Sequence, residues 1–299
     1  MVSKRQIRII SAPSILGLKP NGVELLADRI LSAGLPARFQ VSNPPVIVAD
    51  LNHLYNPNRD PDTGCLNTAA IKQHSMLVAG AVEEAVNQNH FALVLGGDCS
   101  ILIGVMVALR KIGQPGLVFL DAHADFYSPE RSVTGEIADM DLAIVSGNGP
   151  ALLTDINMLR PYVNYEDIIH LGQRDQEETT RFDSPDIRLT GIRCFSEDVV
   201  RSQGVEKIVD QMMQTLERSS SEQLWIHFDT DVLDDKLNPA VDYRLPGGLS
   251  VEEVCRVISA VLGTGKCVGM TVTIYNPRLD IDRTACENII SCMSALTSL

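Results

Sequence analysis

The chain has 299 residues, of which 45% are hydrophobic and 21% charged, and its formal net charge is −13. This length suffices for one large α/β domain or two small ones, and because no linker or internal repeat divides the chain, we expect a single domain over residues 1–299. An acidic chain repels phosphate backbones and anionic lipid surfaces, so neither nucleic acid nor a membrane is an expected partner.

In chain order, short apolar runs rich in β-branched residues alternate with longer amphipathic runs. Residues 1–6 lead directly into the first apolar run without the hydrophobic segment of a signal peptide. No apolar run approaches the roughly 20 residues that span a bilayer, so a cytoplasmic location is expected. Strands are predicted at residues 8–11, 46–49, 92–95, 117–120, 168–171, 224–228 and 268–274. Helices are predicted at residues 23–33, 68–87, 101–111, 199–218 and 251–262.

This alternation predicts an α/β fold with a mainly parallel sheet and helices on both faces. Residues 56–64, rich in Pro, Asp and Asn, are predicted to form a surface loop. The seven cysteines contain no Cys-x-x-Cys pair, which indicates reduced thiols rather than a disulfide framework or a zinc ribbon. In parallel sheets ligands bind beyond the carboxyl ends of the strands, so the residues after each predicted strand are the first candidates for a site.

Three predicted strands end in unusually polar segments. Gly96-Gly-Asp-Cys-Ser100 follows the third strand, Asp121, His123 and Asp125 follow the fourth, and Asp229 and Asp231 follow the sixth. In an extended chain, side chains two positions apart lie on one face, so each set is expected to point in one direction.

Carboxylates and an imidazole brought together in this way would repel and be costly to bury without a cation between them. Two divalent cations a few ångströms apart, held by bridging carboxylates, would remove that cost. A solvated polar loop after a strand is the plainer explanation for any one of the segments. Three such segments in one chain favour a metal centre.

These segments resemble the metal-binding motifs of the arginase/agmatinase/formimidoylglutamase (ureohydrolase) superfamily. The matching residues are Gly96-Gly-Asp-Cys-Ser100, Asp121-Ala-His-Ala-Asp125 and Phe228-Asp-Thr-Asp-Val-Leu-Asp234, with Pro246-Gly-Gly-Leu-Ser250 and Asn276-Pro277 as further landmarks. The resemblance implies a three-layer α/β/α fold with a mainly parallel eight-stranded sheet, assembled as a homo-oligomer, a trimer or hexamer.

The resemblance also implies a set of metal ligands. Asp121 and Asp229 would bridge two metal ions, His123 and Asp231 would complete one site, and Asp125 with Cys99 would complete the other. Two Mn²⁺ ions are the family's expected cofactor. The family's usual residue at position 99 is His, and a thiolate there favours Zn²⁺, Fe²⁺ or Co²⁺. A metal bound through Cys99, a weakened or empty first site, and an inert buried thiol are three outcomes left open.

The implied reaction is hydrolysis of a guanidino or amidino C–N bond with release of urea. A metal-bridging hydroxide would attack the guanidinium-type carbon, and Asp125 would relay a proton to the leaving amine.

Several positions depart from the arginase pattern. Ala138 replaces the His that shuttles protons, Ile274 replaces the Glu that grips the guanidinium, and Tyr127 and Thr134 replace an Asn and a Ser that contact the α-carboxylate. The substrate is therefore not expected to be free L-arginine. A guanidine without a free α-carboxylate and an arginine side chain within a peptide are the two options.

Three acids in the same segment, Glu136, Asp139 and Asp141, could supply the missing cation-binding carboxylate, or could be solvent-facing loop residues. Asp280 and Asp282 are weaker candidates for that role.

His227 lies two residues before Asp229 and hence on the same strand face. It could act as a metal ligand or proton relay, or as a hydrogen-bonding partner beneath the site. The other histidines, His53, His74, His90 and His170, have no such neighbours and are expected to be structural or on the surface.

The leading hypothesis is thus a metal-dependent hydrolase acting on linear amidines. The alternative is a catalytically degenerate relative that serves as a binding or regulatory subunit. Cys99, Ala138 and Ile274 favour the alternative, whereas five intact acidic or imidazole ligands favour the hydrolase.

Overall fold

The computed structural model describes residues 5–299 and contains one eight-stranded sheet in which every strand pair is parallel. The strand order is β2-β1-β3-β8-β7-β4-β5-β6. Residues 1–4, on which the signal-peptide prediction partly rests, lie outside the described residues. The strands are β1 (Ile7–Ala12), β2 (Val46–Ile47), β3 (Phe91–Gly96), β4 (Pro115–Leu120), β5 (Ile168–Leu171), β6 (Arg193–Phe195), β7 (Gln223–Asp229) and β8 (Cys267–Thr273).

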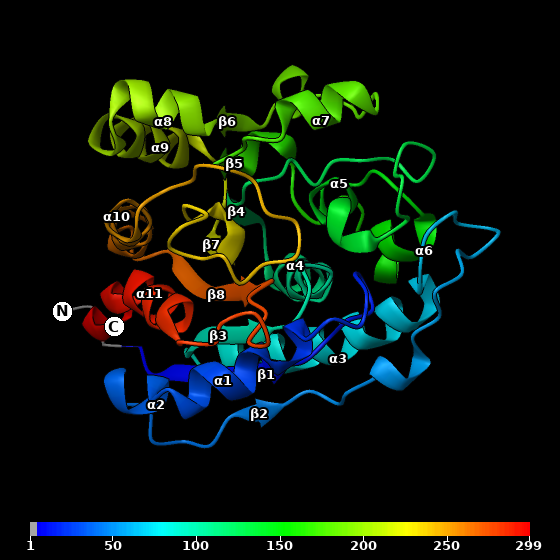
Figure 1. Ribbon diagram of the computed structural model, residues 1–299. Helices are drawn as coiled ribbons and strands as arrows, with labels where there is room; N and C mark the ends of the chain where they lie inside the picture. Colours follow the sequence, from blue (N-terminus) through cyan, green and yellow to red (C-terminus); the bar gives the residue numbers. More distant parts are fainter. Residues whose placement is uncertain (1–4) are drawn as a thin grey trace.

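Helices cover both faces of the sheet and form two separate apolar cores (Figure 1). One core packs against α1 (Leu26–Ser32), α2 (Leu35–Arg38), α8 (Glu197–Gln203), α9 (Val205–Arg218), α10 (Val251–Gly263) and α11 (Thr284–Cys292). The other packs against α3 (Thr68–Asn87), α4 (Ile101–Ile112), α5 (Asp141–Val145) and α6 (Ala151–Thr154). Consecutive residues of the central strands alternate between the two cores, as the pleat of a strand requires. The predicted three-layer α/β/α architecture with a parallel sheet is confirmed.

The strand order brings the polar strand ends together. Strands β3, β8, β7 and β4 are neighbours at the centre of the sheet, although β3 and β4 are consecutive in sequence. The register pairs Leu95 with Val272, Asp229 with Thr273, and Leu120 with Phe228, so the residues that follow these strands lie at one level. This level is the carboxyl edge of the sheet. It lies where the strand order reverses between β3 and β4, which is the usual place for a ligand site in such folds.

The seven predicted strands are all present, and the structure corrects the predictions at other places. The predicted helix 199–218 is wrong as one piece, because Gly204 adopts φ 80 and separates α8 from α9. The edge strand β6 was not predicted, since it has only three residues. The helix α11 and the short helices α5, α6 and α7 (Gln176–Arg181) were also not predicted. Within residues 5–299, each helix is too short or too polar to pass through a lipid bilayer.

The central strands approach each other closely at Gly269 of β8. A Cβ atom there would lie 2.1 Å from Trp225 Cζ3 and 2.5 Å from the carbonyl oxygen of Ala92. The carbonyl belongs to the paired strand β3 and cannot move aside without breaking the ladder. We therefore expect Gly269→Ala to lower the free energy of unfolding by about 3 kcal/mol, measured by chemical denaturation.

A matched control is Gly80→Ala, in the middle of α3, where an added Cβ meets nothing within 4 Å. This change is expected to stabilise the protein by about 0.5–1 kcal/mol, because Ala loses less backbone freedom in a helix than Gly. Equal effects of the two substitutions would contradict the close packing at Gly269.

Candidate metal centre

Cys99 is placed at the carboxyl edge by a close contact between two chain segments. At Gly97, directly after β3, a Cβ atom would lie 1.9 Å from the carbonyl oxygen of Ser14, so only glycine permits the approach. The chain then turns into α4, which begins at Ile101. Cys99 is 1% exposed, and its Sγ lies 2.8 Å from Asp229 Oδ2 and 3.1 Å from Thr273 Oγ1.

The segment after β4 brings its three polar side chains together, but not through an extended chain. The strand ends at Leu120, and the Asp121 Oδ1 oxygen accepts a hydrogen bond of 2.7 Å from the His123 amide. Asp125 adopts φ 44, in the left-handed region. The expectation of an extended Asp-x-His-x-Asp segment is therefore wrong, and a turn closed by Asp121 produces the convergence instead.

Asp229 and Asp231 are related in the same way. Asp229 is the last residue of β7, and Asp231 lies in a 3₁₀ turn, Thr230–Val232. The Asp229 Oδ1 oxygen accepts a 2.9 Å hydrogen bond from the Asp231 amide, so this pair is also held by a turn rather than by an extended strand. Arg174, after β5, donates to the carbonyl oxygen of Asp231 at 2.7 Å and fixes the turn from outside.

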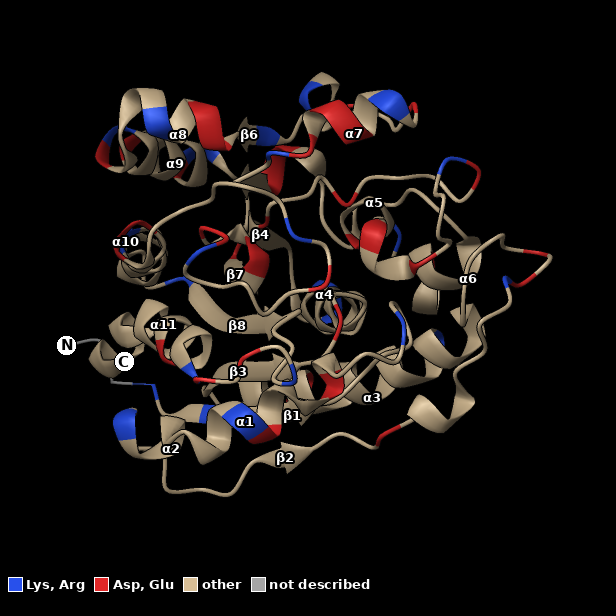
Figure 2. Cartoon of the chain, in the orientation of Figure 1, with Lys and Arg blue, Asp and Glu red and all other residues tan. Residues whose placement is uncertain are grey.

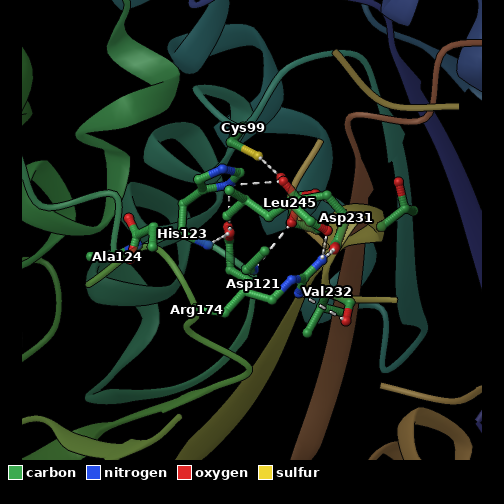
Figure 3. A network of polar contacts seen from close by, with 12 residues as sticks. Cys99, Asp121, His123, Ala124, Arg174, Asp231, Val232 and Leu245 are labelled. Carbon is green, nitrogen blue, oxygen red and sulfur yellow. Dashed lines mark hydrogen bonds and ion pairs between the residues drawn. The ribbon is translucent and has the colours of Figure 1, made fainter. Parts of the chain in front are cut away.

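The side chains from the three strand ends point toward one another (Figure 3). Two groups of ligating atoms result, and within each group all atoms lie within 4.8 Å of one another. The first group contains Cys99, Asp121, His227 and Asp229, and the second contains Asp121, His123 and Asp125. Asp121 belongs to both groups, which is the position that a bridging ligand would occupy. Asp231 joins the second group through an ion pair of 2.9 Å between its Oδ2 and His123 Nδ1.

The electrostatics of the described residues fit a pair of cations. Asp121 is fully buried, and its Oδ2 accepts no hydrogen bond from residues 5–299. Burial and the neighbouring Asp231 raise the pKa of Asp121 to about 7. Burial and the charge of Asp121 also raise the pKa of Asp125. Carboxylates that are costly to ionise together lose that cost when divalent cations bind between them, and carboxylate, imidazole and thiolate are all metal ligands.

Asp231 differs from its neighbours because it has compensating partners. Burial alone would raise its pKa, but the adjacent His123, Arg174 and the Ala122 amide together hold that pKa below its usual value. Burial alone would lower the pKa of the His123 imidazole, but the charges and hydrogen bonds of Asp231 and Asp121 together outweigh burial and raise it. Burial and Asp229 raise the pKa of the Cys99 thiol.

A cavity of about 370 Å³ opens onto these residues. One wall is apolar and contains Leu18, Cys99, Ala138 and Ile274, which belong to a single buried cluster. Ile274 adopts φ 70, a strained conformation for a β-branched residue, and its amide donates to the Gly97 carbonyl at 2.9 Å. The three positions that depart from the arginase pattern, 99, 138 and 274, thus adjoin one another on this wall.

Other residues that line the cavity are acidic. Glu136 is 6% exposed, and its Oε2 accepts a 2.8 Å hydrogen bond from the Tyr243 hydroxyl. Asp139 Oδ2 accepts hydrogen bonds of 2.8 Å from both Ser132 and Thr134. Burial raises the pKa of Glu136 and raises that of Asp139 to about 7. Figure 2 shows red ribbon, which marks Asp and Glu, beside β4 and β7.

All four predicted substrate contacts line the cavity: Tyr127, Thr134, Glu136 and Asp139. Asp141 lies deeper. It is 0% exposed at the start of α5, neither of its oxygens accepts a hydrogen bond within the described chain, and its charge acts on Asp125 and Cys99. Of the two alternatives left open for these acids, solvent-facing loop residues is wrong for Glu136 and Asp141, which are both buried.

The weaker candidates lie elsewhere. Asp280 accepts hydrogen bonds from the Tyr275 hydroxyl and from the Ala285 and Cys286 amides, so it holds the start of α11 and does not line the cavity. Asp282 accepts a hydrogen bond from the Thr284 amide at the start of the same helix. Neither of these weaker candidates is among the residues that line the cavity.

Sequence reasoning missed a further segment that lines the cavity. Asp242 and Tyr243 line the cavity, and Lys19 donates to the Tyr243 hydroxyl at 3.1 Å while its ammonium lies 4.6 Å from the Tyr243 ring centre. The Pro246-Gly-Gly landmark directly after this segment was the available signal. Arg174 was missed as well, although it follows a predicted strand.

Comparison with known proteins gives a consistent picture. Residues 6–295 match a family model described as the arginase family. The chain is 27% identical over 302 residues to an arginase of Staphylococcus aureus (strain MSSA476), with 97% of this chain and 96% of that protein covered. A solved arginase structure from Bacillus cereus has a TM-score of 0.85 at 25% identity and covers 99% of both chains. The agmatine ureohydrolase of Thermoplasma volcanium shares the fold, with a TM-score of 0.69 at 19% identity over 99% of this chain and 89% of that one.

Proposed function

This chain belongs to the arginase family, and we propose that it is a metal-dependent hydrolase that cleaves a guanidino C–N bond with release of urea, in a substrate other than free L-arginine. The candidate substrates are a guanidine without a free α-carboxylate and an arginine side chain within a peptide. The observation that carries this proposal is the charge of the cavity next to the two ligand groups.

Among the described residues that line the cavity, the acids Glu136, Asp139, Glu178 and Asp242 lie outside the ligand groups. The one Lys or Arg among the lining residues is Arg244, whose Nε and Nη2 donate to the Asp235 carboxylate at 2.6 and 2.8 Å. The Thr134 hydroxyl donates to Asp139. The cavity therefore offers carboxylates to a cation and few free donors to a substrate carboxylate, which supports a guanidinium-bearing substrate that lacks an α-carboxylate.

The residues of the two groups would hold two divalent cations, Asp121 between them, and bound cations supply a water-derived nucleophile at neutral pH and stabilise developing negative charge. The chain itself supplies the remaining steps. Glu136 would bind the substrate guanidinium through the oxygen that the Tyr243 hydroxyl leaves free. Asp125 lines the cavity beside Asp121 and would pass a proton to the leaving amine. The buried apolar wall would exclude water from the reacting carbon.

The test is urea release by the protein reconstituted separately with Mn²⁺, Co²⁺, Ni²⁺ and Zn²⁺. The panel contains L-arginine, its decarboxylated amine, its methyl ester and a peptide with an internal arginine. We expect kcat/KM for at least one carboxylate-free guanidine to exceed that for L-arginine by about 100-fold. This is the scale on which a site discriminates against a substrate whose extra polar group, here the α-carboxylate, finds no hydrogen-bonding partner.

Asp229→Asn, assayed in parallel, controls for a contaminating enzyme, because it removes a ligand from the first group. A preference for L-arginine would refute the substrate assignment. Absence of urea from every guanidine, with two metal ions bound per chain, would refute the hydrolase itself.

A further inference from the structure

We propose that His227 is a direct metal ligand, so that Cys99, Asp121, His227 and Asp229 form one closed four-ligand site selective for Zn²⁺ or Co²⁺ over Mn²⁺. The inference rests on the metal centre of the proposed function and concerns which side chains bind the metal. Its basis is that the ligating atoms of these four residues lie within 4.8 Å of one another.

His227 is held in place by groups beneath the site. It is 0% exposed on β7, and its ring stacks on Phe119 of the neighbouring strand β4 with centroids 4.8 Å apart. Its Nδ1 lies 2.8 Å from Thr271 Oγ1 on β8. These two contacts fix the ring position before any ligand binds, which is how metal-binding histidines are usually oriented.

The hydrogen-bond pattern leaves Nε2 free to bind a metal. In the tautomer that the proposal requires, Nδ1 carries the proton and donates to Thr271 Oγ1 at 2.8 Å, and the Thr271 hydroxyl can donate to the Ile226 carbonyl at 3.5 Å. The other nitrogen, Nε2, then presents a lone pair. Its one hydrogen-bonding partner within the described chain is Thr273 Oγ1, at a long 3.5 Å. That same hydroxyl lies 3.1 Å from Cys99 Sγ. Nε2 therefore faces the space between Cys99 and the carboxylates.

The chemistry of the four ligands sets the metal preference. Position 99 provides a thiolate in place of the family's usual His, and His227 on β7 provides an imidazole. Compared with a site that has His at position 99, this site therefore has the same number of imidazoles and one additional sulfur ligand. Thiolate and imidazole favour Zn²⁺ and Co²⁺, whereas Mn²⁺ prefers a shell of oxygen ligands. Two carboxylates, one thiolate and one imidazole complete the four-coordinate shell that Zn²⁺ commonly takes.

The decisive measurement isolates His227 as the imidazole source. In His123→Ala, which removes the partly exposed histidine of the second group, His227 is the sole imidazole left in the two ligand groups. X-ray absorption of this variant with one equivalent of Zn²⁺ should show one sulfur near about 2.3 Å and one imidazole nitrogen near about 2.0–2.1 Å. A spectrum with sulfur and oxygen scattering but no imidazole would overturn the proposal.

A second measurement uses Co²⁺ titration followed by the sulfur-to-cobalt charge-transfer band, which reports only the site that contains Cys99. His227→Gln should weaken Co²⁺ binding by more than about 100-fold, beyond the 10–100-fold loss typical when a ligand's hydrogen-bond partner is removed. His74→Gln, which replaces another buried histidine outside both groups, should leave the titration unchanged. Cys99→Ser should abolish the band.

A smaller loss in His227→Gln, with the visible spectrum of the wild type retained, would make His227 a hydrogen-bonding partner and reject the proposal. These readouts do not involve urea. A protein that binds Zn²⁺ through Cys99 and His227 but hydrolyses no guanidine would refute the proposed function and leave this inference standing.

Discussion

Replacing Asp121 with Asn is expected to abolish binding of at least one metal ion and to reduce urea release by at least about 1,000-fold. Asp121 is the residue shared by the two ligand groups, so both sites lose a ligand at once. Loss of a group that only supports a ligand already costs roughly 10–100-fold, and loss of a shared ligand should cost more. Metal content by elemental analysis and urea release on the best substrate measure the two effects.

The same substitution should stabilise the metal-free protein. Asp121 is buried without a partner for Oδ2, and its pKa is raised from 3.8 to about 7. Between these two values the folded chain binds more protons than the unfolded chain, so the stability of the metal-free wild type falls as pH rises from about 4 to about 7. Asn carries no charge at any pH, so Asp121→Asn should remove this contribution to the fall and be more stable than the wild type at pH 8.

Chemical denaturation after metal removal, at pH 5 and pH 8, tests this expectation. Asp280→Asn is the matched control, because Asp280 is also buried but accepts three hydrogen bonds from Tyr275, Ala285 and Cys286. That change should destabilise the protein at both pH values. If Asp121→Asn were the less stable protein at pH 8, the buried carboxylates would not be the source of strain in the metal-free state.

The second large effect is expected at Glu136. If this buried carboxylate binds the substrate guanidinium, Glu136→Gln removes one partner of a buried charge pair. Such losses cost about 2–5 kcal/mol, equivalent to roughly 30- to 5,000-fold in kcat/KM. Metal content should not change, since Glu136 belongs to neither ligand group. Steady-state kinetics on metal-loaded protein, paired with elemental analysis, separate the two contributions.

Glu178→Gln provides the comparison. Glu178 also lines the cavity, but it is exposed, and an exposed charge contributes only about 0–1 kcal/mol. A fall of less than about fivefold is expected there. Equal losses at the two positions would mean that the cavity attracts cations through its overall charge, and that Glu136 has no specific contact with the guanidinium.

Much of the fold could be predicted from the sequence because its strands are short, β-branched and separated by long helices. Helix α3 was predicted with its observed ends, since an amphipathic pattern continues from Thr68 to Asn87. The break at Gly204 was not predicted, because the apolar positions of α8 and α9 lie at spacings that also suit one continuous helix. Only the positive φ at Gly204 separates the two helices, and a single glycine does not reveal its φ in the sequence.

The metal ligands of the candidate site could be predicted from the sequence, whereas the cavity wall with Asp242 and Tyr243 could not. The ligand positions follow strands, and parallel strands meet at one edge, so Asp121, Asp229 and Cys99 could be expected to converge. The wall with Tyr243 and Asp242 comes from an irregular segment, and no periodic pattern shows that it folds back onto Glu136. Whether Glu136 is buried depends on that segment, so its burial could not be read from the sequence.

The segment predicted as a plain surface loop, residues 56–64, and the residues just after it hydrogen-bond to residues 132–135, of which Val133 and Thr134 line the cavity. Arg59 donates to the carbonyl oxygens of Ser132 and Val133 at 2.9 and 2.6 Å, and the Leu66 amide donates to Gly135 at 2.7 Å. Segments joined in this way open as one cooperative unit in local unfolding. Hydrogen exchange in residues 132–135 should therefore follow that of residues 59–66. A protease cut within residues 59–66 should increase hydrogen exchange in residues 132–135. Residues 59–66 are not among the residues that line the cavity, so we expect the opening of a cavity-lining segment to depend partly on hydrogen bonds from chain outside the cavity.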